Sequence, residues 1–203
     1  MTIYVDGFER SGNTFLGEAM GWTLETNVIT LRSHKISNLQ DKLPEDIFVV
    51  PVRDALPTLV SAKVYRDYLW DNNIQVNERT GDPAELIERL TAYIDYLLTD
   101  EEVFIAPFNS IISDHNALID VFVEKYSDFS VARRYNKDAV IEKNEFTQEQ
   151  KENPYVGNFP RAEASEEKAA AESIFLSTYA TEIEEIQNKI EILYQRYENY
   201  NKI

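Results

Sequence analysis

The chain has 203 residues, a formal net charge of −16, no cysteine and 43% hydrophobic residues. These values indicate one globular domain, or one domain with an appendage. The lack of cysteine excludes disulfides and thiolate metal sites and fits a cytoplasmic protein. The acidity argues against binding to nucleic acid, which needs a basic surface. No apolar run reaches the ~20 residues of a membrane span. Because the N-terminus enters a predicted strand at once, we expect no signal peptide.

A glycine-containing segment follows the first predicted strand, Thr2 to Asp6. Gly7 and Gly12 have the spacing of a Walker A phosphate loop, and Thr14 stands where that motif has Ser or Thr. Asn13 replaces the Walker lysine, so the residue that grips the β- and γ-phosphates of a nucleoside triphosphate is missing. A helix that begins near Gly12 would turn its N-terminus toward a bound anion. The segment therefore predicts a phosphate cradle for an anion other than ATP or GTP.

Further short, apolar strands are predicted at 27–31, 46–52, 103–106 and 129–132. Helical patterns separate these strands. Such an alternation indicates a parallel sheet with helices on both faces. We predict an α/β fold of the phosphate-loop type, a three-layer domain with a central parallel sheet. Ligands are then expected at the carboxyl ends of the strands.

Two of the intervening helices carry start signals. Asp82 can cap one, with Pro83 at its first position and Glu85 completing a capping-box-like pattern. Ser113 can cap the other. His115 falls in the first turn of that second helix, and we interpret it as structural.

The chain changes character after residue 141. Residues 142–172 are polar and strongly charged, and we interpret them as a loop or lid, because unstructured stretches of this length are usually functional or disordered. In residues 173–203 apolar side chains recur in steps of three and four, the pattern of a long amphipathic helix. This helix either packs on its own domain or joins two copies in a homodimer. The predicted domain comprises residues 1–141.

Three segments, in the correct order, resemble the sulfotransferases that use 3'-phosphoadenosine 5'-phosphosulfate (PAPS). The first resembles the family's 5'-phosphosulfate loop, with Glu9 in place of its usual proline. By this resemblance the loop binds the co-substrate through Arg10, Ser11, Gly12, Asn13, Thr14 and Phe15. Backbone N–H groups of this loop would then face the phosphosulfate.

The second segment, Arg32-Ser33-His34, follows the second predicted strand and resembles the family's Lys-Thr/Ser-His segment. The resemblance implies that His34 is the base that takes the proton of the acceptor hydroxyl. The pKa of an unperturbed histidine lies near neutrality, which suits this task. Arg32 and Arg10 would stabilise the charge on the transferred group and on the leaving phosphate.

The third segment places Arg53 at a strand end and Ser61 eight residues later, on the next helix. This is the spacing of the family's 3'-phosphate motif, so the resemblance implies that both residues bind that phosphate. Arginine offers the bidentate fork that a phosphate accepts. A later stretch with Gly157 and Arg161 is similar to the family segment that closes over the 3'-phosphate.

The resemblance implies transfer of a sulfuryl group from PAPS to a hydroxyl of a small-molecule, sugar or lipid acceptor, without a metal. Two alternatives stay open. A phosphate-loop kinase would need Mg²⁺ and ATP, and Asn13 in place of lysine opposes it. A non-catalytic binding or assembly protein on the same fold would use the tail helix as its interaction surface.

Overall fold

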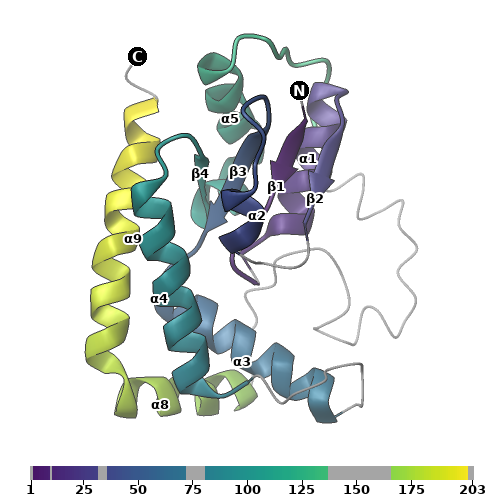
Figure 1. The fold of residues 1–203 in the computed structure, drawn as a ribbon. Helices are drawn as coiled ribbons and strands as arrows, with labels where there is room; N and C mark the ends of the chain where they lie inside the picture. The colour runs from purple at the N-terminus through teal and green to yellow at the C-terminus, as the bar shows by residue number, and fades with distance from the viewer. Residues whose placement is uncertain (1, 10, 32–35, 72–80, 137–165, 201–203) are drawn as a thin grey trace, which may run out of the picture.

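The computed structural model describes residues 2–9, 11–31, 36–71, 81–136 and 166–200 (Figure 1). Within these ranges the chain forms an α/β domain around a parallel sheet, as predicted. The strands are β1 (Ile3–Val5), β2 (Val28–Thr30), β3 (Ile47–Val52) and β4 (Phe104–Pro107). The helices are α1 (Asn13–Leu24), α2 (Ile36–Gln40), α3 (Ala55–Asp71), α4 (Pro83–Thr99), α5 (Phe108–Lys125), α8 (Glu166–Thr178) and α9 (Ala180–Tyr200).

The strand order among the described residues is β2-β1-β3-β4. Ile3 pairs with Val28 of β2 on one side and with Ile47 of β3 on the other, and Val49 pairs with Phe104 of β4. The chain therefore adds β2 on one side of β1, then crosses back and adds β3 and β4 on the other side. In open parallel sheets, ligands bind at the carboxyl ends of the strands where the order reverses. Here that point lies between β1 and β3.

Helices cover both faces of the sheet, because side chains of successive strand residues point to opposite faces. Val49 lies in the core formed with α1 and α5. Its neighbours Phe48 and Val50 lie in the second core, formed with α3, α4, α8 and α9. This arrangement confirms the predicted layers and the C-terminal helix. The phosphate-loop type of fold stays a prediction.

The predicted fifth strand at 129–132 is wrong. The chain is irregular there. The amide of Ala132 donates to Thr23 O at the end of α1, 2.9 Å away, rather than to a strand. The ring of Phe129 packs on that of Phe122, with centroids 5.6 Å apart. An apolar, β-prone stretch is thus held by side-chain packing without joining the sheet.

The two predicted helix starts have different outcomes. Asp82 caps α4 as expected, because its Oδ1 accepts from the amides of Ala84 and Glu85 at 2.9 and 3.2 Å. The other prediction, a helix that starts at Ser113, is wrong. α5 already begins at Phe108 and is interrupted at Asp114, whose backbone is non-helical. Asp114 Oδ1 accepts from the amide of Ala117 at 3.0 Å and so caps the second part of the helix.

The C-terminal segment forms two helices that meet at Tyr179, and α8 begins at Glu166, within the stretch interpreted as a lid. The rest of that stretch, 142–165, lies outside the described residues. α9 buries its apolar stripe in the core of its own chain, beside α4 (Figure 1). The stripe consists of Ile183, Ile186, Ile190 and Leu193. Of the two alternatives for this helix, packing on its own domain is therefore observed. A homodimer through the helix stays a prediction.

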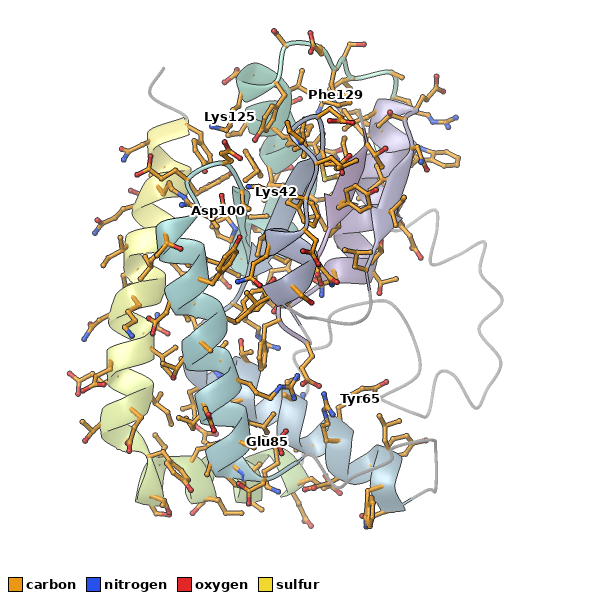
Figure 2. The ribbon with its side chains drawn as sticks, in the orientation of Figure 1. Lys42, Tyr65, Glu85, Asp100, Lys125 and Phe129 are labelled. Carbon is orange, nitrogen blue, oxygen red and sulfur yellow. The ribbon has the colours of Figure 1, made fainter. Side chains whose placement is uncertain are left out.

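Polar contacts near the end of α4 hold α9 and the segment that follows α2. Arg196 of α9 donates to Leu97 O at 3.2 Å and to Asp100 O at 2.9 Å, which satisfies carbonyl groups at the helix C-terminus. Lys42 forms a 2.9 Å salt bridge with Asp100, and Figure 2 shows these two residues near each other. Lys42 also forms a 3.1 Å salt bridge with Glu102. None of the helices in the described ranges is long and apolar enough to cross a membrane.

The bridge between Lys42 and Asp100 should make stability depend on pH. Burial is the largest single influence on the pKa of Asp100 and raises it, but the hydrogen bonds from Lys42, the Glu102 amide and Tyr96, together with the charge of Lys42, lower the pKa overall. Burial lowers the pKa of Lys42, but hydrogen bonds to Asp100 and Glu102 raise it overall. The bridge is therefore complete between the ordinary carboxyl and lysine pKa values, about 3.9 and 10.4. It is lost when the pH falls through the lowered pKa of Asp100 or rises through the raised pKa of Lys42.

We expect Asp100→Asn to lower the free energy of unfolding by about 2 kcal/mol at pH 7, the usual contribution of a hydrogen bond to a charged group. The difference from the wild type should begin to shrink below about pH 3.9, where the carboxylate of the unfolded chain is protonated, and should disappear below the lowered pKa of Asp100 in the folded protein. Urea unfolding at pH 7 and at pH 3 measures both. Glu101→Gln, an exposed neighbour, is the control for the loss of charge. An equal loss at both pH values would contradict this account.

Candidate functional site

The segment between β1 and α1 passes so close to β3 that glycine is required. A Cβ atom at Gly7 would stand 2.5 Å from Pro51 O and 2.7 Å from Asn13 Oδ1. At the other end of the loop, Gly12 has φ of +90°, a left-handed conformation that disfavours other residues. A Cβ atom there would lie 3.3 Å from the ring of Phe108. Both predicted glycines are thus explained by the local geometry.

Two buried side chains close this loop on itself. Ser11 Oγ donates to Phe8 O at 2.6 Å, and Asn13 Nδ2 donates to Gly7 O at 2.9 Å. Ser11 is 1% exposed and Asn13 is 6% exposed. The residue in the position of the Walker lysine therefore binds the loop's own backbone. Ser11 and Asn13 were both predicted to contact the cofactor. Because their side chains are bonded to the loop itself, they could bind a ligand only through their backbone.

The N-terminus of α1 follows directly on this loop, with Gly12 as its N-cap residue. The first helical hydrogen bond runs from the amide of Leu16 to Gly12 O at 3.0 Å. Amides before it, such as that of Thr14, project from the helix N-terminus. Gly12 has no side chain with which to cap them. This end of the helix therefore offers backbone donors and a positive dipole to an anion.

The side chain of Phe15 does not belong to the site. Its ring is 1% exposed and packs edge to face on His115 and Tyr135, at centroid distances of 5.3 and 5.8 Å. Phe15 could therefore meet a ligand only through its amide. His115 Nε2 lies 3.2 Å from Tyr135 O, in agreement with its interpretation as structural.

Arg53 lies directly after β3 and reaches the same edge of the sheet as the loop. Its guanidinium carbon stands 4.6 Å from the centre of the Phe108 ring, a cation–π contact. This is the ring that limits the space at Gly12. Arg53 and the loop thus share one neighbour, Phe108, the first residue of α5, which the sequence interpretation did not single out. An aromatic residue directly after β4 was its only signal.

Ser61 is half-buried and lies on α3, six residues after the first residue of that helix. That separation is about 9 Å along the axis at 1.5 Å per residue. Arg53 and Ser61 therefore belong to one β3–α3 unit, as the motif spacing predicted. α1, α3 and α5 all begin at the carboxyl end of the strand that precedes them, so three helix N-termini add positive potential around Arg53.

The remaining predicted site residues lie outside the described residues: Arg10, Arg32, His34, Gly157 and Arg161. The two chain segments that flank Arg32 and His34 are described, and both are held at the end of β1. The amide of Leu31 donates to Val5 O at 3.0 Å. On the other side, Asn38 of α2 donates to Asp6 Oδ2 at 2.8 Å.

Two carboxylates beside the loop, those of Asp6 and Glu9, are buried. Asp6 is fully buried, and the hydroxyl of Tyr93 donates to its backbone oxygen at 3.1 Å. Glu9 is 4% exposed and accepts two 2.8 Å hydrogen bonds from Arg66 of α3. Arg89 of α4 forms a further 3.2 Å salt bridge with it. The hydrogen bonds to Glu9 raise the pKa of Arg66 against the opposing effect of burial.

Glu9 therefore tethers the loop to two helices that are distant in sequence. Its place beside the loop was visible in the sequence, but its partners were not, because 57 residues separate Glu9 from Arg66. Among the residues that the structure describes, no group of three or more His, Asp or Glu side chains could hold a metal ion.

Comparison with known proteins does not assign the chain to a family. No protein-family model, no curated protein and no solved structure matches the chain. The function of the chain is therefore inferred from the motifs of its sequence and from the geometry of the site.

Replacing the buried carboxylate of Glu9 should be costly. Glu9→Gln leaves Arg66 and Arg89 without their charge partner, and we expect a loss of about 3 kcal/mol, the low end for breaking a buried ion pair. The low end applies because the Arg89 side chain is 30% exposed. Urea unfolding at pH 7 measures the loss. Glu88→Gln, at an exposed position of α4, is the matched control. A loss below about 0.5 kcal/mol, typical of surface substitutions, would disprove the tether.

Proposed function

We propose that this chain is a PAPS-dependent sulfotransferase that acts in the cytoplasm on a small-molecule, sugar or lipid hydroxyl. The observation that carries the proposal is the placement of the phosphate-type loop and of Arg53 against one ring, Phe108, at the edge where the strand order reverses. The sequence motifs that resemble the family's two phosphate sites thus meet at the position where α/β sheets bind nucleotides.

The chemistry of the edge supports an anionic ligand. The chain carries a net charge of −16, so long-range attraction does not favour anions. Close to the loop, however, the N-terminus of α1 and the guanidinium of Arg53 supply positive charge and N–H donors. A site of this kind selects a ligand by short-range hydrogen bonds to phosphate oxygens.

A kinase is less well supported. Asn13 donates to Gly7 O, so the position of the Walker lysine has no cation for the γ-phosphate. Asp54, the carboxylate at the end of β3, accepts hydrogen bonds from Tyr194 and Gln187 of α9. A carboxylate engaged in this way is poorly placed to hold Mg²⁺.

A purely non-catalytic assembly protein is also less well supported. Its interaction surface was to be the apolar stripe of the tail helix. That stripe is buried against α3, α4 and β4 of the same chain.

In the proposed reaction the acceptor oxygen attacks the sulfur of PAPS. The new O–S bond forms while the bond from sulfur to the phosphate oxygen breaks, which yields a sulfate ester and adenosine 3',5'-bisphosphate. The acceptor proton passes to His34 as general base, with Arg32 and Arg10 stabilising the transferring group and the leaving phosphate. Arg53 and Ser61 hold the 3'-phosphate, with Gly157 and Arg161 closing over it. By analogy with phosphoryl transfer, catalysis then consists mainly of positioning and charge stabilisation.

The first test is calorimetric binding of adenosine 3',5'-bisphosphate without metal. We expect the wild type to bind it, and Arg53→Ala to weaken binding by roughly 10- to 100-fold, the value of a lost charge-assisted hydrogen bond. Arg134→Ala removes an equal charge from an exposed position and should leave binding unchanged. Binding of Mg²⁺-ATP alone would favour the kinase. Binding of neither ligand would refute the proposal.

The second test asks for turnover. With PAPS and a panel of phenolic, sugar and lipid hydroxyl compounds, release of adenosine 3',5'-bisphosphate should fall at least about 100-fold in His34→Gln, the usual effect of removing a general base. Binding of the bisphosphate should be kept in that variant. His115→Gln, at the structural histidine, should retain turnover. If His34→Gln turns over at the wild-type rate, the role of that residue as base is wrong.

A further inference from the structure

We propose that the C-terminal helix α9 is part of the anion site: Tyr194 and Gln187 are positioning residues that hold Arg53 beside the phosphate loop. This inference rests on the proposed function in one respect, that Arg53 binds a phosphate. The core of the resemblance to sulfotransferases covers roughly residues 1–135, and neither it nor the later stretch with Gly157 and Arg161 assigns a role to α9.

The hydroxyl of Tyr194 contacts the residues on both sides of Arg53. It donates to Asp54 Oδ1 at 3.0 Å and lies 3.4 Å from Val52 O. Burial, together with the Asp54 carboxylate, raises the pKa of Tyr194 well above its ordinary value. The hydroxyl therefore stays protonated, and stays a donor, throughout the neutral range.

Gln187 binds the next peptide along the same turn. Its Oε1 accepts from the amide of Ala55 at 2.9 Å, and its Nε2 donates to Asp54 Oδ1 at 3.4 Å and to Glu191 Oε1 at 2.7 Å. The hydroxyl of Thr58 in α3 donates to Asp54 O at 2.8 Å. The same Thr58 hydroxyl lies 3.3 Å from Arg53 O. Side chains thus contact every residue of the turn from Val52 to Ala55, which restricts the backbone of Arg53.

The guanidinium itself is supported from a different direction. The ring of Phe108 packs against it at 4.6 Å from the centroid. An arginine that is already oriented loses less side-chain entropy on binding a phosphate, and this advantage appears as affinity. Tyr194 and Gln187 orient the backbone end of Arg53, while Phe108 supports its charged end.

α9 is suited to this task because it is anchored independently of the site. Ile186 and Ile190 are buried in the core, and Arg196 binds the end of α4. Lys189 forms a 2.6 Å salt bridge with Asp95 of α4. A residue presented by such a fixed helix holds a partner more accurately than one presented by a loop.

The test compares Tyr194→Phe with Tyr200→Phe. Each substitution removes one hydroxyl from the same helix, but the Tyr200 hydroxyl contacts Val103 O at 3.3 Å, away from Arg53. We expect Tyr194→Phe to weaken binding of adenosine 3',5'-bisphosphate about fivefold or more, the usual scale of a lost hydrogen bond. Tyr200→Phe should change it less than twofold. In an Arg53→Ala background, where no cation is left to position, Tyr194→Phe should have no further effect, because coupled residues are non-additive.

A second measurement needs no ligand. In ¹⁵N-labelled protein the Nε–H resonance of Arg53, identified by its loss in Arg53→Lys, should shift or broaden in Tyr194→Phe and stay in place in Tyr200→Phe. A loss of global stability alone would not produce that difference. Gln187→Ala, which removes the contacts to Ala55 and Asp54, should act in the same direction and serves if Tyr194→Phe folds poorly.

The two measurements separate the possible failures. If the wild type does not bind the bisphosphate, the proposed function fails, while the resonance of Arg53 still decides whether α9 positions it. If binding and resonance are both unchanged in Tyr194→Phe and in Gln187→Ala, the positioning role is overturned. An equal effect of Tyr194→Phe with and without Arg53 would also overturn it.

Discussion

The candidate site depends on the close approach of the loop after β1 to the end of β3. At Gly7 there is no room for a Cβ atom beside Pro51 O, and the side chain of Asn13 returns to Gly7 O to hold the loop in that position. This contact sets the distance between the N-terminus of α1 and the end of β3. The proposal that the helix N-terminus and Arg53 act on one ligand therefore requires this tight packing of the loop.

The loop also joins the two cores of the domain. On one face Glu9 is bound by Arg66 of α3 and Arg89 of α4, and on the other face Gly12 lies against Phe108 of α5. Buried charge is tolerated there because the carboxylate is paired and hydrogen-bonded. The fixed position of the loop matters for anion binding, because the chain has a net charge of −16. The proposed anion would have to be bound by donors fixed at short range, since the surrounding field does not favour it.

The C-terminal helices complete the domain and are not a detached appendage. α8 and α9 bury apolar side chains in the same core as β3, α3 and α4. Through Tyr194 and Gln187, α9 also contacts the turn that carries Arg53. The same helix therefore stabilises the core and contacts the candidate ligand site, so a change in the packing of α9 should also alter the position of the turn that carries Arg53.

Local sequence determined the layers of the fold, because strand runs, glycine spacing and the Asp82 cap are short-range signals that survive in most tertiary contexts. It also placed Arg53 and Ser61 on one β3–α3 unit. It failed at 129–132, where packing of Phe129 on Phe122 took precedence over β propensity. Only the tertiary structure could pair Glu9 with Arg66, Arg53 with Phe108, and Asp54 with Tyr194, 140 residues away. Such contacts depend on how helices pack across the sheet, and no local pattern in the chain encodes them.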